Sequence, residues 1–246
     1  MATIDHVTLR ASDLGKSLEL YSRVFELLSF DRERFDGDSF HEWNDFSIAQ
    51  ADDEHPPTHG VHIGFAAASR AQVDDWWRAL TAAGYESDGA PGLRCEYGPD
   101  YYGAFVLDHD RNSIERVHHR TATPTTGVID HLWIRVAELA ASKRFYTGIA
   151  PAVGVRARDL GERLHVISTS GTFSLIAGSP TENLHLAIGV EDRERVRDFH
   201  AFGLHSGGRD NGAPDERPEY HAGYYAAYLL DPDSNNVEAV FHDRAV

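Results

Sequence analysis

Short runs of alternating apolar and polar residues occur four times along the chain, each followed by a helical pattern. The runs at residues 4–10, 61–66, 131–136 and 184–189 alternate with a period of two, as in a strand with one buried face. After each run, apolar residues recur at helical spacing, and further short runs bounded by turn residues follow. The pattern predicts four modules, each with one strand, one helix and three more strands.

Two long stretches of the second half repeat stretches of the first. "IDHVTLRASDLGKSLELY" (4–21) matches "IDHLWIRVAELAASKRFY" (129–146) with a constant offset of 125 residues. "YYGAFVLDHDRNSIERVHH" (101–119) matches "YYAAYLLDPDSNNVEAVFH" (224–242) with an offset of 123. The chain is therefore interpreted as a tandem duplication, and repeats of this kind determine the architecture.

The duplication predicts two domains, residues 1–120 and 128–246. The segment "HRTATPTTG" (119–127) between them has the Thr, Pro and Gly content of a linker. Each domain would contain two βαβββ modules, which gives an α+β fold in which the two modules of one half share one site.

Net charge, apolar stretches and cysteine content limit the partners and the kinds of metal site that we expect. A net charge of −16 disfavours nucleic acid and anionic membrane surfaces as partners. No apolar stretch approaches the roughly 20 residues of a membrane span, and the start lacks a secretory signal, so we expect a cytoplasmic protein acting on a small molecule. A homo-oligomer is left open. The single cysteine, Cys95, excludes an internal disulfide and a thiolate metal cluster, so a metal would need His, Asp or Glu ligands.

Six residues of these types recur at matching positions in the two halves. Strand alternation places four histidines opposite the apolar, helix-packing face, and each half has a glutamate in a short strand after an Asp-rich turn. The predicted metal ligands are His6, His62 and Glu115 in the first half and His131, His185 and Glu238 in the second. Two imidazoles and one carboxylate form the facial triad that holds a divalent metal with open positions, as in non-heme iron oxygenases.

A structural role is the alternative for each histidine. Most strand histidines are hydrogen-bonded structural residues, and a duplication copies these as readily as it copies ligands. The metal hypothesis therefore depends on the coincidence of three ligand types in one half, all on the face away from the helices.

These motifs resemble the vicinal oxygen chelate superfamily, which includes glyoxalases, extradiol ring-cleaving dioxygenases and bleomycin-resistance proteins. The resemblance is carried by the "IDH" strands, by "GVHIGF" and "NLHLAIGV", and by the endings "DHDRNSIE" and "DPDSNNVE". It implies two tandem glyoxalase-type domains with cupped mixed sheets around a metal held by the six ligands. Among the metals, Fe(II) is favoured, with Mn, Zn, Ni and Co as alternatives.

Within the superfamily, one departure from glyoxalase I and one partial match to a ring-cleaving signature favour a dioxygenase. Glyoxalase I usually has a fourth ligand, a glutamate, where this chain has Ser47 and Ser174, and its loss leaves an open coordination sphere. The segment "HAGYYAAYLLDPDSNNVE" partly matches the ring-cleaving signature through His221 and Tyr228. The resemblance implies that Fe(II) is held by the second-half triad, while His221 exchanges protons and Tyr228 donates a hydrogen bond to substrate.

Aromatic residues are also expected near the metal sites. Trp133, Tyr225 and Tyr102 are predicted to form aromatic walls of substrate-binding sites. A glyoxalase-like lyase or isomerase is the second functional reading. The third is a non-catalytic protein that binds a small molecule such as an antibiotic.

Overall fold

The computed structural model describes residues 3–28, 34–119 and 127–243, and the predicted α+β fold of four βαβββ modules is confirmed. Most of the predicted linker, residues 120–126, lies outside the described residues. The first module contains β1 (Thr3–Ala11), α1 (Leu14–Leu27), β2 (Arg34–Asp36), β3 (Phe40–Trp43) and β4 (Phe46–Gln50). The second contains β5 (His62–Ala66), α2 (Arg70–Ala82), β6 (Ser87–Leu93), β7 (Tyr102–Leu107) and β8 (Ser113–His118).

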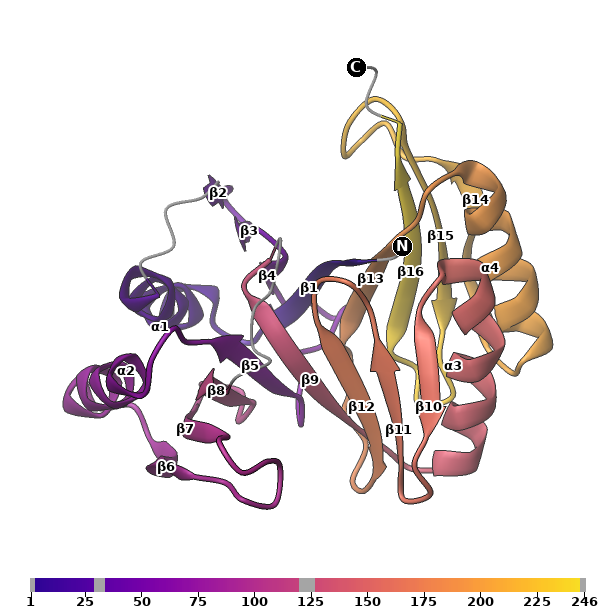
Figure 1. The fold of residues 1–246 in the computed structure, drawn as a ribbon. Helices are drawn as coiled ribbons and strands as arrows, with labels where there is room; N and C mark the ends of the chain where they lie inside the picture. Colours follow the sequence, from indigo (N-terminus) through magenta and orange to yellow (C-terminus); the bar gives the residue numbers. More distant parts are fainter. Residues whose placement is uncertain (1–2, 29–33, 120–126, 244–246) are drawn as a thin grey trace.

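The second half repeats this order. The third module contains β9 (Ile129–Val136), α3 (Leu139–Val153), β10 (Arg156–Asp159), β11 (Arg163–Ile167) and β12 (Thr172–Ala177). The fourth contains β13 (His185–Gly189), α4 (Arg193–His205), β14 (Arg209–Glu216), β15 (Tyr224–Leu230) and β16 (Asn236–His242). Figure 1 shows the four helices as two pairs, α1 with α2 and α3 with α4, at opposite sides of the molecule.

Side-chain caps mark where three of the helices begin. Asp13, Ser69 and Asp192 each precede a helix and accept a hydrogen bond from the backbone N–H three residues later. Such a cap satisfies one of the free N–H groups of the first turn. The helix α3 ends at Gly154, whose left-handed conformation suits a residue without a Cβ.

The sheets join the two halves, which corrects the predicted pairing of modules. The first eight-stranded sheet has the order β14-β15-β16-β13-β1-β4-β3-β2, and the second has the order β10-β11-β12-β9-β5-β8-β7-β6. Thus module one shares a sheet with module four, and module two with module three. The seams are the antiparallel pairs β1–β13 and β5–β9. Periodicity shows which face of a strand is buried, but it does not show which strand lies alongside.

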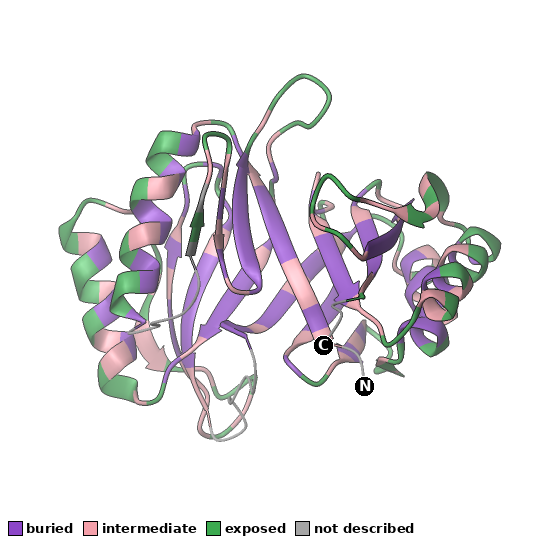
Figure 2. Cartoon of the chain, turned by 90° about the horizontal axis from the view of Figure 1, so that it is seen from above, coloured by how far each residue is buried: buried purple, intermediate pink, exposed green. Residues whose placement is uncertain are grey.

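The apolar faces of these strands pack under the helices. Val7, Leu132 and Leu186 are almost completely buried, and Figure 2 shows buried residues along the central strands and exposed ones along the outer helix faces. The opposite face of each sheet carries the histidines, as strand alternation predicts. Within the described residues, no helix is long and apolar enough to span a membrane.

Candidate metal sites between the two halves

The first cluster, called the His6 site, consists of His6, His185 and Glu238. His6 comes from β1 of the first half, while the other two come from β13 and β16 of the second. The two Nε2 atoms lie 3.0 Å apart, and Glu238 Oε2 lies 3.1 Å from His185 Nε2 and 3.7 Å from His6 Nε2. The three donor atoms therefore converge on one point across the β1–β13 seam.

The second cluster, called the His131 site, consists of His131, His62 and Glu115. His131 lies on β9 of the second half, and the other two lie on β5 and β8 of the first. The His62 and His131 Nε2 atoms are 3.3 Å apart, and Glu115 Oε2 lies 3.0 Å from His62 Nε2 and 3.2 Å from His131 Nε2. In each cluster all donor atoms lie within 4.8 Å of one another.

Both donor sets fit a divalent metal. Metal–nitrogen bonds of about 2.1 Å at right angles would separate neighbouring donors by roughly 3.0 Å, near the distances observed here. Two imidazoles and one carboxylate suit Fe, Zn, Mn or Co and leave coordination positions open.

Carboxylates hold one histidine of each site in place. Asp5 Oδ1 lies 2.8 Å from His6 Nδ1, and Asp130 Oδ2 lies 2.8 Å from His131 Nδ1. In each case the hydrogen bond to Nδ1 leaves Nε2 directed at the cluster. A histidine that binds metal typically donates its second ring N–H to such a partner, so this arrangement supports ligation over a purely structural role.

A further histidine contacts each of these aspartates. His242 Nε2 lies 3.0 Å from Asp5 Oδ2, and His119 Nε2 lies 3.2 Å from Asp130 Oδ2. His221 Nε2 in turn lies 2.9 Å from His242 Nδ1. The two aspartates, His242 and His119 were not predicted, although both copies of the sequence show the signal: "IDH" at the first strand and a histidine at the end of the last.

The second histidine of each site is held differently in the two halves. His62 Nδ1 lies 3.1 Å from Ser113 Oγ, which donates to Asp88. His185 Nδ1 instead lies 2.8 Å from the side-chain amide of Asn236. At the His131 site a carboxylate thus supports both histidines, directly at His131 and through Ser113 at His62. At the His6 site a carboxylate supports only His6.

The two histidines of each site have pKa values shifted in opposite directions. Burial opposes protonation of His6 and His131, but the hydrogen bonds to Asp5 and Asp130 and the charge of the site glutamates outweigh it and raise both pKa values to about 9. Burial lowers the pKa of His62, despite its contact with a glutamate.

Burial and hydrogen bonds also set the pKa values of His185 and Glu115. Burial also lowers the pKa of His185. Burial would raise the pKa of Glu115, but hydrogen bonds from His131 and His62 outweigh this effect and lower it to about 2. Each site therefore has an ionised carboxylate, one readily protonated histidine and one that favours the neutral, metal-binding form.

Two glycines make room for the His131 site. A Cβ on Gly64 would collide with the imidazole of His131, and a Cβ on Gly103 would collide with Glu115 Oε1. Gly64 thus makes room for a candidate metal ligand from the other half.

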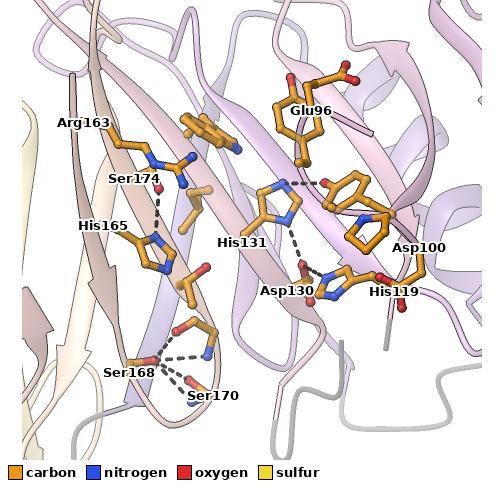
Figure 3. Close-up of a pocket in the computed structure, with 18 of the residues that line it drawn as sticks. Glu96, Asp100, His119, Asp130, His131, Arg163, His165, Ser168, Ser170 and Ser174 are labelled. Carbon is orange, nitrogen blue, oxygen red and sulfur yellow. Dashed lines mark hydrogen bonds and ion pairs between the residues drawn. The ribbon is translucent and has the colours of Figure 1, made fainter. Parts of the chain in front are cut away.

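Each site opens to its own cavity. The cavity at His131 has a volume of about 600 Å³, and the cavity at the His6 site about 1860 Å³. Figure 3 shows His131 directed into the smaller cavity between two walls of polar side chains.

The structure brings together the predicted ligands in a different grouping. The expected triad of His131, His185 and Glu238 does not form, because His131 lies in the other sheet and His6 takes its place. All six residues still lie in the two clusters. His221 and Tyr228 line the cavity of the His6 site, next to the second-half residues with which they were predicted.

Two of the three predicted aromatic walls face away from the cavities. The Tyr102 hydroxyl donates to Asp74 of α2, and Tyr225 packs under Arg193 of α4. The preceding residue in each "YY" pair faces the site instead: Tyr101 donates to Glu115 and Tyr224 to Glu238. Two adjacent tyrosines fit either phase of the strand alternation.

Trp133 is the third of these aromatic residues. It lies on the wall of the smaller cavity, where the guanidinium of Arg163 is 5.4 Å from the centroid of its ring.

Comparisons with known proteins agree with this architecture. Residues 3–115 match the model of the Glyoxalase/Bleomycin resistance protein/Dioxygenase superfamily. No curated protein shows a significant sequence match to the chain. Glyoxalase I from Zea mays superposes with a TM-score of 0.69 at 19% identity, over 98% of this chain and 93% of that one. A putative dioxygenase from Bacillus subtilis subsp. subtilis str. 168 superposes with a TM-score of 0.64 at 12% identity, over 98% and 86%.

The family match covers the first half, and the structural similarity extends the same fold over the second, duplicated half. The resemblance seen in the motifs is thereby confirmed: the first half matches the Glyoxalase/Bleomycin resistance protein/Dioxygenase superfamily, and the whole chain has the fold of glyoxalase I.

Proposed function

We propose that the chain is a metal-dependent enzyme that acts on a small molecule with adjacent oxygen atoms, and that ring-cleaving dioxygenation at the His6 site is its leading reaction. The observation that carries this proposal is the convergence of two histidines and one glutamate at each seam, with donor atoms within 4.8 Å of one another. In oxygenases, a ligand set of this kind leaves positions for both substrate and O₂. A bound divalent metal would polarise the substrate oxygens and lower their proton affinity.

His221 and Tyr228 support the His6 site as the reactive one. His221 contacts His242, which reaches Asp5, so a hydrogen-bonded chain leads from the cavity to the partner of His6. Nδ1 of His221 donates to the backbone carbonyl of Ala222, so Nε2, which faces His242, is the nitrogen that can exchange a proton along this chain.

Tyr228 would act as a hydrogen-bond donor. Burial and the charge of Glu238 raise its pKa well above the usual range, so the phenol stays protonated at neutral pH. Its ring lies 6.5 Å from that of His185, within reach of a substrate bound at the cluster. A neutral phenol there can donate to a substrate oxygen.

A glyoxalase-like isomerase is the second candidate, and Glu42 favours it. Glu42 lines the cavity of the His6 site, and its charge helps to keep His6 protonated. A carboxylate in this place could move a proton between neighbouring carbons of a substrate without consuming oxygen.

Metal analysis and an oxygen electrode together test the proposal. Protein purified without a tag would be reconstituted anaerobically with Fe(II), and O₂ uptake would be measured against a panel of catechols. We expect uptake that Glu238→Gln abolishes. Anaerobic turnover of a 2-oxoaldehyde adduct with Ni²⁺ or Zn²⁺ would instead favour the isomerase. Ligand binding without turnover under any of these conditions would favour a binding protein, and the absence of bound metal would contradict both enzymatic readings.

A further inference from the structure

Equivalent strand positions beside the two metal sites carry different side chains. On the metal-facing side of each sheet, three residues on adjacent strands pair side by side in a row. The strands are β1, β4 and β3 in the first sheet and β9, β12 and β11 in the second. The rows are Thr8–Ser47–Glu42 at the His6 site and Trp133–Ser174–His165 at the His131 site. An acidic residue at one site thus corresponds to a histidine at the other.

The neighbouring row extends the contrast. Arg163 pairs with Ile176 on β12, and its counterpart Phe40 pairs with Ala49 on β4. Arg163 lines the smaller cavity and Phe40 the larger one. A permanently charged guanidinium therefore replaces an aromatic ring.

Arg163 has donors available in this cavity. Its guanidinium lies over Trp133, an arrangement that holds the cation in place. Among the residues that the structure describes, no carboxylate or carbonyl forms a hydrogen bond or ion pair with this guanidinium. Arg158 of β10 pairs directly with His165 and therefore places a second positive charge on the same face of the sheet.

The acidic groups of the smaller cavity lie elsewhere. Figure 3 shows Arg163 and His165 on one wall and Glu96 and Asp100 on the other, with His131 between them. Asp130 is already bonded to His131 and His119. The wall that carries Arg163 is therefore the cationic side of the cavity.

The larger cavity has the opposite character near the equivalent positions. Arg10 lines it, but so do Glu42, Glu54 and Glu219. An anion placed beside Phe40 and Glu42 would meet the carboxylate of Glu42, and Arg10, which has the one guanidinium among the described lining residues, hydrogen-bonds the backbone carbonyl of Gln50.

We propose that the two sites accept different substrate classes, and that Arg163 binds a carboxylate or similar anionic group of the substrate at the His131 site. Trp133 is the positioning residue that holds the guanidinium. A planar guanidinium binds a carboxylate through two parallel hydrogen bonds, which a hydrated ammonium cannot reproduce. The cavity volume of about 600 Å³ suits a small-molecule ligand. The assignment of this ligand as a substrate rests on the proposed function.

A matched pair of probes tests this inference. 3,4-Dihydroxybenzoate and catechol differ only in the carboxylate, and their binding to protein loaded with redox-inactive Zn²⁺ can be measured by calorimetry. We expect one binding site per chain that prefers the benzoate by about tenfold, as a charge-assisted, partly exposed pair would provide. Arg163→Gln should abolish the preference and Arg163→Lys should restore part of it. Arg197→Gln, which removes an exposed charge on α4, should leave it intact.

The outcomes separate this inference from the proposed function. Circular dichroism and zinc content would show that the variants fold and retain metal. Equal affinity for the two probes in the wild type, or a preference that persists in Arg163→Gln, would overturn the inference. If zinc does not bind, the proposed function fails, and the same titration of metal-free protein decides the inference alone. An Arg163-dependent preference would then support it, and equal or unmeasurable binding would overturn it.

Discussion

His6 and His185 are separated by 179 positions in the chain, yet their Nε2 atoms lie 3.0 Å apart. The antiparallel register of β1 with β13 places Thr8 opposite His185 and His6 opposite Ala187, so the two rings meet across the seam. Neither half alone supplies all three residues of either cluster. A metal at this position would connect the first strand of the chain to its last module.

Removal of the supporting carboxylates should weaken each site separately. We expect Asp5→Asn to reduce metal affinity at the His6 site and Asp130→Asn at the His131 site, each by about 10–100-fold, because the ligand imidazole loses its oriented partner. Competition with a chromophoric chelator would measure the affinities. Asp53→Asn, an exposed change, serves as the control. Unchanged affinity in both site variants would show that the aspartates do not orient ligands.

A single methyl group should disable one site and spare the other. In Gly64→Ala the new Cβ would collide with the His131 ring, so we expect the metal content to fall from two per chain to one. Gly98→Ala is the matched control, because the nearest atom to its Cβ is 3.9 Å away. Elemental analysis gives the stoichiometry. Two metals in folded Gly64→Ala would contradict the assigned position of His131.

Metal binding should release protons near neutral pH. The pKa values of His6 and His131 are raised to about 9 without metal, so both are protonated at pH 7 and must lose that proton to coordinate. We expect about one proton released per metal at pH 7, declining as the pH rises through about 9. Titration calorimetry in buffers of different ionisation enthalpy measures this number. Release that does not change with pH would show that these histidines are already neutral.

Asp45, which contacts the backbone at the start of the second half, should make the free energy of unfolding depend on pH. This buried carboxylate accepts hydrogen bonds from the backbone of Val128 and Ile129, and burial raises its pKa to about 6. The folded state therefore holds the proton more tightly than the unfolded chain does, and stability falls as the pH rises from about 4 to about 6.

Asp45→Asn tests this effect. The free energy of unfolding of the variant should rise relative to the wild type by on the order of 2–3 kcal/mol between pH 4 and 7. Urea denaturation at several pH values measures the difference. A constant difference across this range would mean that Asp45 does not titrate there.

The sequence was sufficient to identify the modules and the faces of their strands. The offsets between repeats and the alternation around His6 and His62 indicate which side chains lie away from the helices, since these features depend only on local geometry. Alternation failed at Tyr101 and Tyr102, where two adjacent aromatic residues leave the phase undetermined.

The grouping of the ligands could not be derived in the same way. It depends on β1 pairing with β13 and β5 with β9, and these contacts join strands far apart in the chain. Matching ligands within each half were therefore assigned to one site. The supporting residues Asp5 and His242 were missed for the same reason, because they meet only across the seam.

Each candidate metal site takes its ligands from both halves of the chain, and two double variants test this arrangement most directly. His6→Ala with His185→Ala removes two ligands of one site, whereas His131→Ala with His185→Ala removes one ligand from each. Metal content per folded chain, measured after anaerobic reconstitution, should remain at about one in the first variant and fall towards zero in the second. One metal retained by the second variant together with none in the first would contradict sites shared between the halves.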